Sequence, residues 1–263
     1  MDTPHLPARR QVLAGGLAAG AAAAAPALAA TALESRVVEL RQYTLRGGRR
    51  DDLITLFEHE FIESQDAVGA HILGLFRDLD DPDRFVWLRG FPGMDARAEA
   101  LKAFYFGPVW KAHRAAANAT ILDSDNVLLL RPAPSGGGFA ARTSRRGGEI
   151  LGFIHYLDDA LTAPFADFFE TNIRPRAQAD GAQVLASFVS ETTPNTFPQL
   201  PVREKDRVFV WFARPPAGQA AAFLERWRKR TGWRDTAGDP LLPAFMRKPE
   251  VLRLQPTARS PLA

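Results

Sequence analysis

Hydrophobic and polar positions along the chain follow two rhythms, and these rhythms succeed each other in the same order twice. A two-residue period predicts a strand, and a three-to-four-residue period predicts a helix. The first half predicts, in chain order, a strand, a helix, two strands, a broken helix and a last strand, at residues 37–43, 49–68, 70–77, 84–91, 94–118 and 126–131. The break falls at Gly107-Pro108. Proline fits the first turn of a new helix because its missing N–H would have no partner there.

The second half repeats residue pairs of the first half at a nearly constant distance. Phe57-Glu58 and Gly69-Ala70 recur 112 positions later. Further along, Trp211 follows its match Trp87 by 124 positions, so the second half carries an insertion, most simply the Pro-rich loop 193–205. A repeat of this length is too long for a solenoid unit and predicts two related domains of about a hundred residues each.

Each predicted domain has the order β-α-β-β-α-β, at residues 36–132 and 149–257, with 133–148 between them. This order gives an antiparallel four-stranded sheet with both helices on one face. The other face is uncovered, so we expect the two sheets to pair within the chain into a closed or nearly closed barrel wrapped by helices. Residues 133–148 are rich in Gly, Pro, Ser and Arg, which is typical of a flexible linker.

Composition narrows the classes of protein to which this fold can belong. The chain has no cysteine, which excludes disulfide frameworks, zinc ribbons and cysteine nucleophiles. Lys and Arg number 33 against 30 Asp and Glu, and a formal charge of +3 is too small and too mixed for a nucleic-acid surface. Hydrophobic residues make up 46% and charged residues 24%, as in ordinary globular domains.

Residues 1–29 have the pattern of a cleaved export signal. A polar start ends in Arg9-Arg10, and residues 12–29 carry no charge and consist mostly of Ala, Gly and Leu. The stretch Ala27-Leu28-Ala29 suits a signal peptidase. The paired arginines resemble the signal read by the twin-arginine export machinery. We expect a periplasmic or secreted protein with no stable membrane anchor after cleavage. A retained anchor is the alternative, which the many Gly and Ala residues disfavour.

Three stretches of the first half agree in composition, order and spacing with a known pattern: VELRQY at 38–43, DRFVWLRGF at 83–91 and FYFGPVWKAHR at 104–114. Together they resemble the NIPSNAP family, a branch of the dimeric α+β-barrel superfamily. The resemblance covers 36–132 well and 149–256 as a diverged copy. It implies an α+β fold in which two tandem ferredoxin-like (βαββαβ) domains form an intramolecular dimeric α+β barrel. It implies no reaction, although neighbouring branches include cofactor-independent monooxygenases and haem-binding enzymes.

His113 is the candidate catalytic residue, because imidazole is the side chain best suited to move a proton near neutral pH. Trp110, His113 and Arg114 fall on one surface of the predicted helix by their three- and four-residue spacing. In one interpretation His113 is the base for a small enolic or quinol-like substrate. In the other it is a structural histidine that bonds a carbonyl beside a buried Trp110.

Charged and aromatic side chains alternate on one face of two predicted strands. By the two-residue period, Arg41 and Tyr43 share a face with Glu39. The candidate ligand-binding residues on the strands and the following helical region are Arg41, Tyr43, Trp87, Arg89, Tyr105, Trp110 and Arg114. If the strand face points into the barrel, its arginines can hold an anionic or carbonyl-bearing ligand. If Arg41 instead pairs with Glu39 or another carboxylate, the same residues form a buried structural network.

Metal and cofactor sites have little support in the sequence. The five histidines include no i, i+4 pair, and no cysteine is present, so we expect no metal site. We also expect no cofactor. Haem is the alternative, and it would need an axial ligand such as His113 or His155. In the second half Tyr156 is aligned with Tyr43, which would bring His155 towards the opposite side of the barrel.

Two functions are compatible with these features. The first is an exported NIPSNAP-like protein whose barrel binds a small organic molecule, with the question of cofactor-free chemistry, monooxygenase-like or isomerase-like, left open. The second is a non-catalytic scaffold or interaction module whose helix surfaces contact a protein partner. Neither involves nucleic acid, and both are compatible with a homo-oligomer.

Overall fold

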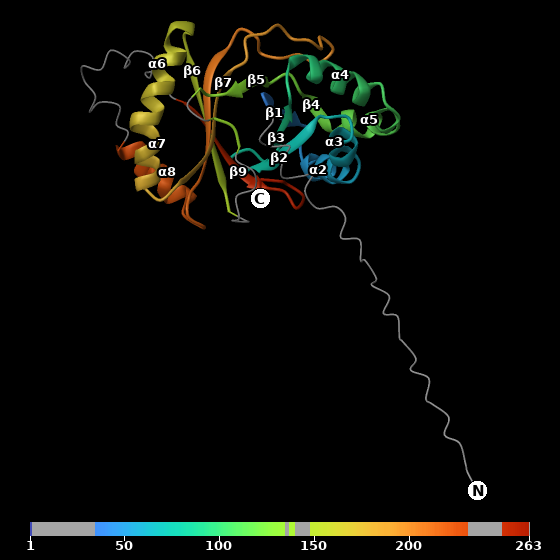
Figure 1. Ribbon diagram of the computed structural model, residues 1–263, viewed down its shortest axis with the longest axis horizontal. Helices are drawn as coiled ribbons and strands as arrows, with labels where there is room; N and C mark the ends of the chain where they lie inside the picture. Colours follow the sequence, from blue (N-terminus) through green and yellow to red (C-terminus); the bar gives the residue numbers. More distant parts are fainter. Residues whose placement is uncertain (2–34, 135–136, 140–147, 231–248, 263) are drawn as a thin grey trace.

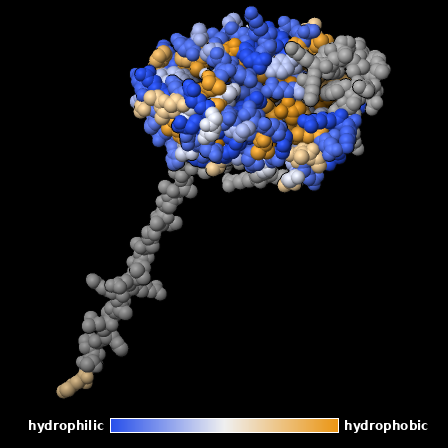
Figure 2. Space-filling model, turned by 180° about the vertical axis from the view of Figure 1, so that it is seen from behind, coloured by the Kyte–Doolittle hydropathy of each residue, from blue (hydrophilic) through white to orange (hydrophobic). Residues whose placement is uncertain are grey.

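The computed structural model describes Met1 and residues 35–134, 137–139, 148–230 and 249–262. Apart from Met1, the predicted export signal lies outside these residues, as does most of the predicted linker. Within them, no helix is long and apolar enough to cross a membrane. Figure 1 shows a group of strands with helices on two opposite sides. Polar residues cover most of the face seen in Figure 2, and apolar residues gather there in smaller patches.

The strands of both halves form one antiparallel sheet that closes on itself. The strands are β1 Val37–Leu45, β2 His71–Asp78, β3 Arg84–Phe91, β4 Ile121–Asp123, β5 Val127–Pro132, β6 Ile150–Leu157, β7 Gln183–Ser190, β8 Arg207–Arg214 and β9 Glu250–Pro256. The barrel order is β1-β3-β2-β9-β6-β8-β7-β5, and β5 pairs again with β1. The short β4, which the sequence did not predict, pairs with the end of β1. The prediction of a closed barrel is confirmed.

The two halves share the barrel wall at two seams. At one seam β2 pairs with β9, with Phe76 opposite Pro256. At the other β5 pairs with β7, with Leu130 opposite Ser190. Each half therefore contributes four strands to a wall that neither half closes alone.

Helices cover the outside of the barrel in two groups (Figure 1). The first group is α2 Arg50–Leu56, a π-helical segment Phe57–Phe61, α3 Ile62–Asp66, α4 Met94–Tyr105 and α5 Pro108–Thr120. The second group is a 3-10 turn Asp159–Leu161, α6 Thr162–Phe168, a π-helical segment Phe169–Ile173, α7 Arg174–Ala179 and α8 Ala220–Arg230. As predicted, α5 begins at Pro108.

In each half the π-helical segment continues into a short α-helix, α3 in the first half and α7 in the second, and both helices end in the same kind of cap. Gly69 has φ +85° and Gly181 has φ +87°, a left-handed conformation that costs glycine little because it has no Cβ. Ala70 N donates to Gln65 O at 3.0 Å, and Ala182 N donates to Ala177 O at 2.9 Å. These are the bonds of a Schellman motif, which turns the chain from the helix into the next strand.

The barrel interior is filled by apolar side chains. Residues of all eight barrel strands, together with Phe139, meet in one cluster: Val38, Leu40, Leu73, Phe76, Val86, Leu88, Leu128, Leu130, Phe139, Ile150, Ile154, Leu185, Ala186, Phe188, Val208, Val210, Phe212, Leu252 and Leu254. Side chains alternate along a strand, so Glu39 and Arg41 lie on the outer face, against the helices. The first alternative for this face, that it points into the barrel, is therefore wrong.

Part of the predicted linker packs into the core. Phe139 is buried, and its ring lies 5.3 Å from that of Phe188 and 5.5 Å from that of Phe212. Nearby, Ala133 N donates to Ser187 O at 3.0 Å. The Gly- and Arg-rich composition around Phe139 gave no indication of this contact.

The loop between β7 and β8 reaches across to the helices of the first half (Figure 1). Thr196 Oγ1 donates to Met94 O in α4 at 3.1 Å. Phe197 is buried in a cluster that includes Phe91 and Leu101. The insertion predicted for the second half therefore lies over the helical layer of the first.

Candidate functional site

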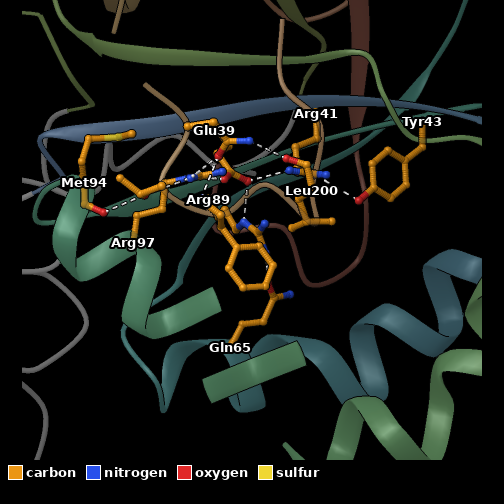
Figure 3. Close-up of polar contacts among 11 residues, drawn as sticks. Glu39, Arg41, Tyr43, Gln65, Arg89, Met94, Arg97 and Leu200 are labelled. Atoms are coloured by element: carbon orange, nitrogen blue, oxygen red, sulfur yellow. Dashed lines mark hydrogen bonds and ion pairs between the residues drawn. The ribbon is translucent and has the colours of Figure 1, made fainter. Parts of the chain in front are cut away.

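Three arginines converge on one buried carboxylate, that of Glu39 in β1 (Figure 3). Arg41 Nη1 lies 2.8 Å from Oε2 and Arg89 Nε lies 2.7 Å from the same oxygen. Arg97 Nε lies 2.6 Å from Oε1. All four side chains are fully buried. We call these four residues the Glu39 cluster. Its members come from β1, β3 and α4, so the cluster ties the barrel wall to the helical layer.

Neutral polar groups surround the Glu39 cluster. Arg89 Nη1 donates to Gln65 Oε1 of α3 at 2.8 Å, and Arg41 Nε donates to the Tyr43 hydroxyl at 3.0 Å. Arg97 Nη1 donates to Oδ1 of Asn195, which lies in the loop before β8, at 3.0 Å. The ion pair of Arg41 with Glu39, which the second alternative for this face predicted, is present in the structure.

The charges of the Glu39 cluster do not balance. Burial alone would raise the pKa of Glu39, but the positive charges of the three arginines hold it well below its usual range, so the carboxyl is ionised. Burial raises the pKa of Tyr43 to about 12 although Arg41 opposes the shift, so the phenol keeps its proton. Three guanidiniums against one carboxylate leave an excess of two positive charges.

Several donors of this region have no hydrogen-bond partner among the described residues. They are Nη2 of Arg41, Arg89 and Arg97, and the indole Nε1 of Trp87. A buried donor without a partner costs about 1–3 kcal/mol. The Glu39 cluster therefore combines uncompensated charge with unused hydrogen-bonding capacity.

The second half has apolar residues at the corresponding places. Leu151 and Phe153 of β6 and Ala213 of β8 occupy the register positions that hold charges in the first half. Phe153 stacks on Trp211 with the ring centroids 4.1 Å apart. At these register positions the second half therefore has apolar side chains where the first half has charges.

The strand register also corrects the alignment of the second half. Tyr43 stands opposite Phe85, and His155 stands opposite Phe209, so His155 and not Tyr156 is the counterpart of Tyr43. Burial lowers the pKa of His155 to about 3, so the imidazole is neutral. Its Nε2 accepts a hydrogen bond from Trp211 Nε1 at 3.1 Å.

A cavity of about 90 Å³ lies between the barrel wall and the helices of the first half. Its lining is mostly aromatic and consists of Tyr43, Leu53, Phe57, Phe61, Gln65, Trp87, Phe104, Tyr105, Trp110, Ala117, Asn118, Ile121, Ser124 and Leu200. Leu200 comes from the loop before β8, so both halves contribute to the cavity. The guanidiniums lie behind this lining. The Arg89 Cζ is 5.0 Å from the ring centroid of Trp87 and 5.8 Å from that of Tyr105.

The structure brings some of the sequence-predicted residues together and separates others. Four of them line the cavity, namely Tyr43, Trp87, Tyr105 and Trp110, and two lie in the Glu39 cluster behind it, namely Arg41 and Arg89. His113 and Arg114 are not part of the lining. His113 Nε2 lies 3.3 Å from Glu60 Oε2, and each of these two side chains is more than a third exposed. Arg114 is exposed to solvent.

Sequence reasoning missed Gln65, Arg97, Asn195 and Leu200. Gln65 and Arg97 are polar residues that interrupt the buried faces of α3 and α4, and this interruption was the available signal. Asn195 and Leu200 belong to the loop before β8 and touch residues about a hundred positions away. No local pattern indicates such a contact.

The described residues show no cluster suited to a metal ion, and neither candidate haem ligand lines the cavity. No group of three or more His, Asp or Glu side chains within the described ranges is arranged to hold a metal ion. Of the two histidines considered for haem, His113 lies outside the cavity lining and faces Glu60, and His155 already accepts a bond from Trp211.

The first half carries the sequence pattern of a known family. The NIPSNAP model matches residues 38–135. The NIPSNAP match spans less than half of the 263 residues, includes β1, β3, α4 and α5, and so contains the Glu39 cluster. The resemblance to NIPSNAP is confirmed over these residues. No curated protein sequence matches the chain.

Solved structures extend the similarity to both halves at the level of the fold. A protein from Fusobacterium nucleatum described as a "Putative monooxygenase" is 11% identical with a TM-score of 0.52, over 84% of this chain and 91% of that chain. This likeness supports the mixed α+β fold with its closed antiparallel barrel. A NIPSNAP family protein from Agrobacterium tumefaciens is 25% identical over 37% of this chain and 93% of that chain, with a TM-score of 0.35.

Proposed function

We propose that the protein binds a small planar organic molecule in the cavity between the barrel wall and the helices of the first half. The observation that carries the proposal is the lining, in which Tyr43, Phe57, Trp87, Tyr105 and Trp110 present aromatic rings to one space. Pockets for small molecules are mostly apolar and aromatic, with a few polar groups that fix orientation.

The size of the cavity limits the part of a ligand that it can enclose. At about 90 Å³ it is smaller than the cavity of roughly 150 Å³ that holds benzene in another protein. Asn118 is exposed and Ser124 is partly exposed, so the lining reaches the surface there. We infer that a planar acid or ring enters in part and that any larger portion extends past these two residues.

We propose ligand binding without a chemical step. A general base must lie within hydrogen-bond reach of the proton that it removes, and His113 does not line the cavity. Tyr43 does line it, but with a pKa of about 12 it holds its proton at neutral pH. The lining offers hydrogen-bond donors and rings, which favours recognition of a ligand over proton abstraction from it.

A substitution that fills the cavity tests the proposal. Ala117 on α5 is buried and lines the cavity, whereas its neighbour Ala116 is exposed. A thermal-shift screen of small planar compounds should give ligands that stabilise the wild-type protein, by about 2.7 kcal/mol at a hundredfold excess over Kd. Ala117→Leu should abolish the shift and the matched control Ala116→Leu should keep it. Equal shifts in both variants would place the ligand elsewhere and contradict the proposal.

We propose, further, that residues 1–29 direct export through the twin-arginine pathway and are then removed, which makes the mature protein periplasmic or secreted. Arg9-Arg10, the uncharged residues 12–29 and Ala27-Leu28-Ala29 support this. Changing Arg9 and Arg10 to lysine should block transport, whereas the same change at Arg145-Arg146 should not. Normal processing of the first double variant would contradict the twin-arginine assignment.

We infer that the two halves are tandem copies of one ferredoxin-like domain. Each half has the order β-α-β-β-α-β, with a π-helical segment in its first helix at Phe57–Phe61 and Phe169–Ile173. Each also has a register shift in its second strand, after Ile72 and after Val184. Both pairs of features are 112 positions apart. An intramolecular pair closes the barrel within one chain, so light scattering should show a monomer.

A further inference from the structure

We propose that the ligand of this cavity carries an oxyanion, a carboxylate or the oxygen of a phenolate or enolate, on a planar frame. The inference rests on the proposed function, since it names the class of molecule that the same cavity selects. It is carried by two residues of the lining whose side chains hold a hydrogen-bond donor, Tyr43 and Trp87, and by the uncompensated positive charge behind them.

The first donor is the indole N–H of Trp87. Trp87 is 2% exposed, it lines the cavity, and its Nε1 has no hydrogen-bond partner among the described residues. Indole nitrogen can only donate a hydrogen bond, so only an acceptor atom satisfies it. An acceptor on a ligand would remove the penalty of a buried donor without a partner.

The second donor is the hydroxyl of Tyr43. Its oxygen accepts a hydrogen bond from Arg41 Nε at 3.0 Å, so the hydroxyl proton is left to be donated. The ring of Tyr43 stands edge-on to that of Trp87 with centroids 5.7 Å apart, and both residues line the cavity. Two neighbouring donors suit an oxygen with several lone pairs, as an oxyanion has.

The charge behind the lining decides between an anion and a neutral acceptor. The Glu39 cluster holds two more positive than negative charges and is fully buried. The Arg41 Cζ lies 5.4 Å from the Trp87 ring centroid, and that of Arg89 lies 5.0 Å from it. The Trp87 ring, which lines the cavity, therefore lies directly against both guanidiniums. A field that water does not screen acts strongly over such a distance and favours a negative ligand.

The second half serves as an internal comparison. The counterpart of Trp87 is Trp211, whose Nε1 is satisfied by His155 at 3.1 Å. Apolar residues, including Leu151 and Phe153, replace the cluster there. Among the described residues, these register positions of the second half are apolar and the indole is satisfied, so packing alone does not explain why the first half keeps three arginines around one carboxylate.

Benzoate and benzamide are the probes, because they share size and planarity and differ in charge. Isothermal titration with the full chain should give a Kd for benzoate at least about tenfold lower than for benzamide, since hydrogen bonds to a charged group are about twice as strong as neutral ones. Trp87→Phe keeps an aromatic side chain and removes the donor, and it should weaken the binding of benzoate about tenfold. Tyr43→Phe should act in the same direction. The matched control Trp211→Phe should leave benzoate affinity within about threefold.

The possible results separate this inference from the proposed function. Equal affinities for benzoate and benzamide, both lost in Ala117→Leu, would overturn the oxyanion inference and leave the planar-ligand proposal standing. Benzoate binding that is unchanged in both Trp87→Phe and Tyr43→Phe would also overturn it, because the donors would then play no part. Failure of both probes and of every other planar compound in the screen would overturn both proposals.

Discussion

Replacing Glu39 by glutamine keeps the shape of the side chain and removes the one negative charge of the Glu39 cluster. Three buried guanidiniums would then face one another with no carboxylate between them. The matched comparison is a fourfold variant, Glu39→Leu with Arg41→Met, Arg89→Met and Arg97→Met. This variant changes more atoms but removes every charge at nearly constant volume.

The expected magnitudes follow from the burial of the cluster. Removing one partner of a buried ion pair costs about 3–5 kcal/mol. Glu39 forms ion pairs with three arginines at 2.6–2.8 Å. We therefore expect Glu39→Gln to lower the free energy of unfolding by an amount at the upper end of this range, about 5 kcal/mol. Replacing a whole buried charge cluster by apolar residues of similar volume is often neutral or stabilising, so the fourfold variant should lie within about 2 kcal/mol of the wild type. Leu151, Phe153 and Ala213 already form such an apolar layer in the second half.

Equilibrium unfolding in urea at pH 7, followed by tryptophan fluorescence, measures both variants against the wild type. The single variant should unfold at a lower urea concentration than the fourfold variant. A Glu39→Gln protein within about 1 kcal/mol of the wild type would refute the claim that the carboxylate holds three charges together. A fourfold variant less stable than the single variant would refute the claim that the fold does not need the cluster.

Two further predictions concern the rest of the chain. Burial lowers the pKa of His155 to about 3, whereas it is about 6.5 in an unfolded chain. Between these two pH values the unfolded state binds more protons than the folded state. The free energy of unfolding therefore falls as the pH drops through this range. Urea unfolding should show a loss of about 2 kcal/mol between pH 6.5 and 5 that is absent in His155→Gln, and an equal loss in the variant would contradict this assignment. Phe197→Ala should lower the free energy of unfolding by about 3–5 kcal/mol, because the ring is buried against the first half. Its neighbour Phe106 is exposed, so Phe106→Ala should lower it by less than about 1 kcal/mol. Similar values for the two variants would show that the loop adds little to stability.

Most of the fold could be predicted from local periodicity. The strand 84–91 and the helix starts at Met94 and Pro108 agree with the structure, because alternation and the Gly-Pro break act within a few residues. The π-helical segments could not be predicted, since Phe57–Phe61 has ordinary helical spacing. The burial of Phe139 and the docking of the loop before β8 depend on contacts with distant strands and helices.

The candidate site could be predicted in some of its members but not in its arrangement. Alternation placed Arg41 and Tyr43 on one face, but it could not say which face is inside a closed barrel. That depends on which set of side chains is apolar in all eight strands, and Val38 and Leu40 belong to that set. His113 and Trp110 share a helix, yet only Trp110 lines the cavity. Three residues along a helix leave the two side chains about 60° apart around its axis, so His113 can lie just outside the edge of the lining although Trp110 belongs to it.

The indole proton of Trp87 reports most directly on the central claim, that a donor of this cavity binds an oxyanion. In an NMR spectrum of the nitrogen-15-labelled protein, the Trp87 indole peak among the five tryptophans is identified by its loss in Trp87→Phe. Saturation with benzoate should move this peak downfield, with a smaller shift for benzamide and none for the Trp211 indole, which is already bonded to His155. A Trp87 peak that stays in place while benzoate saturates the protein would contradict the account.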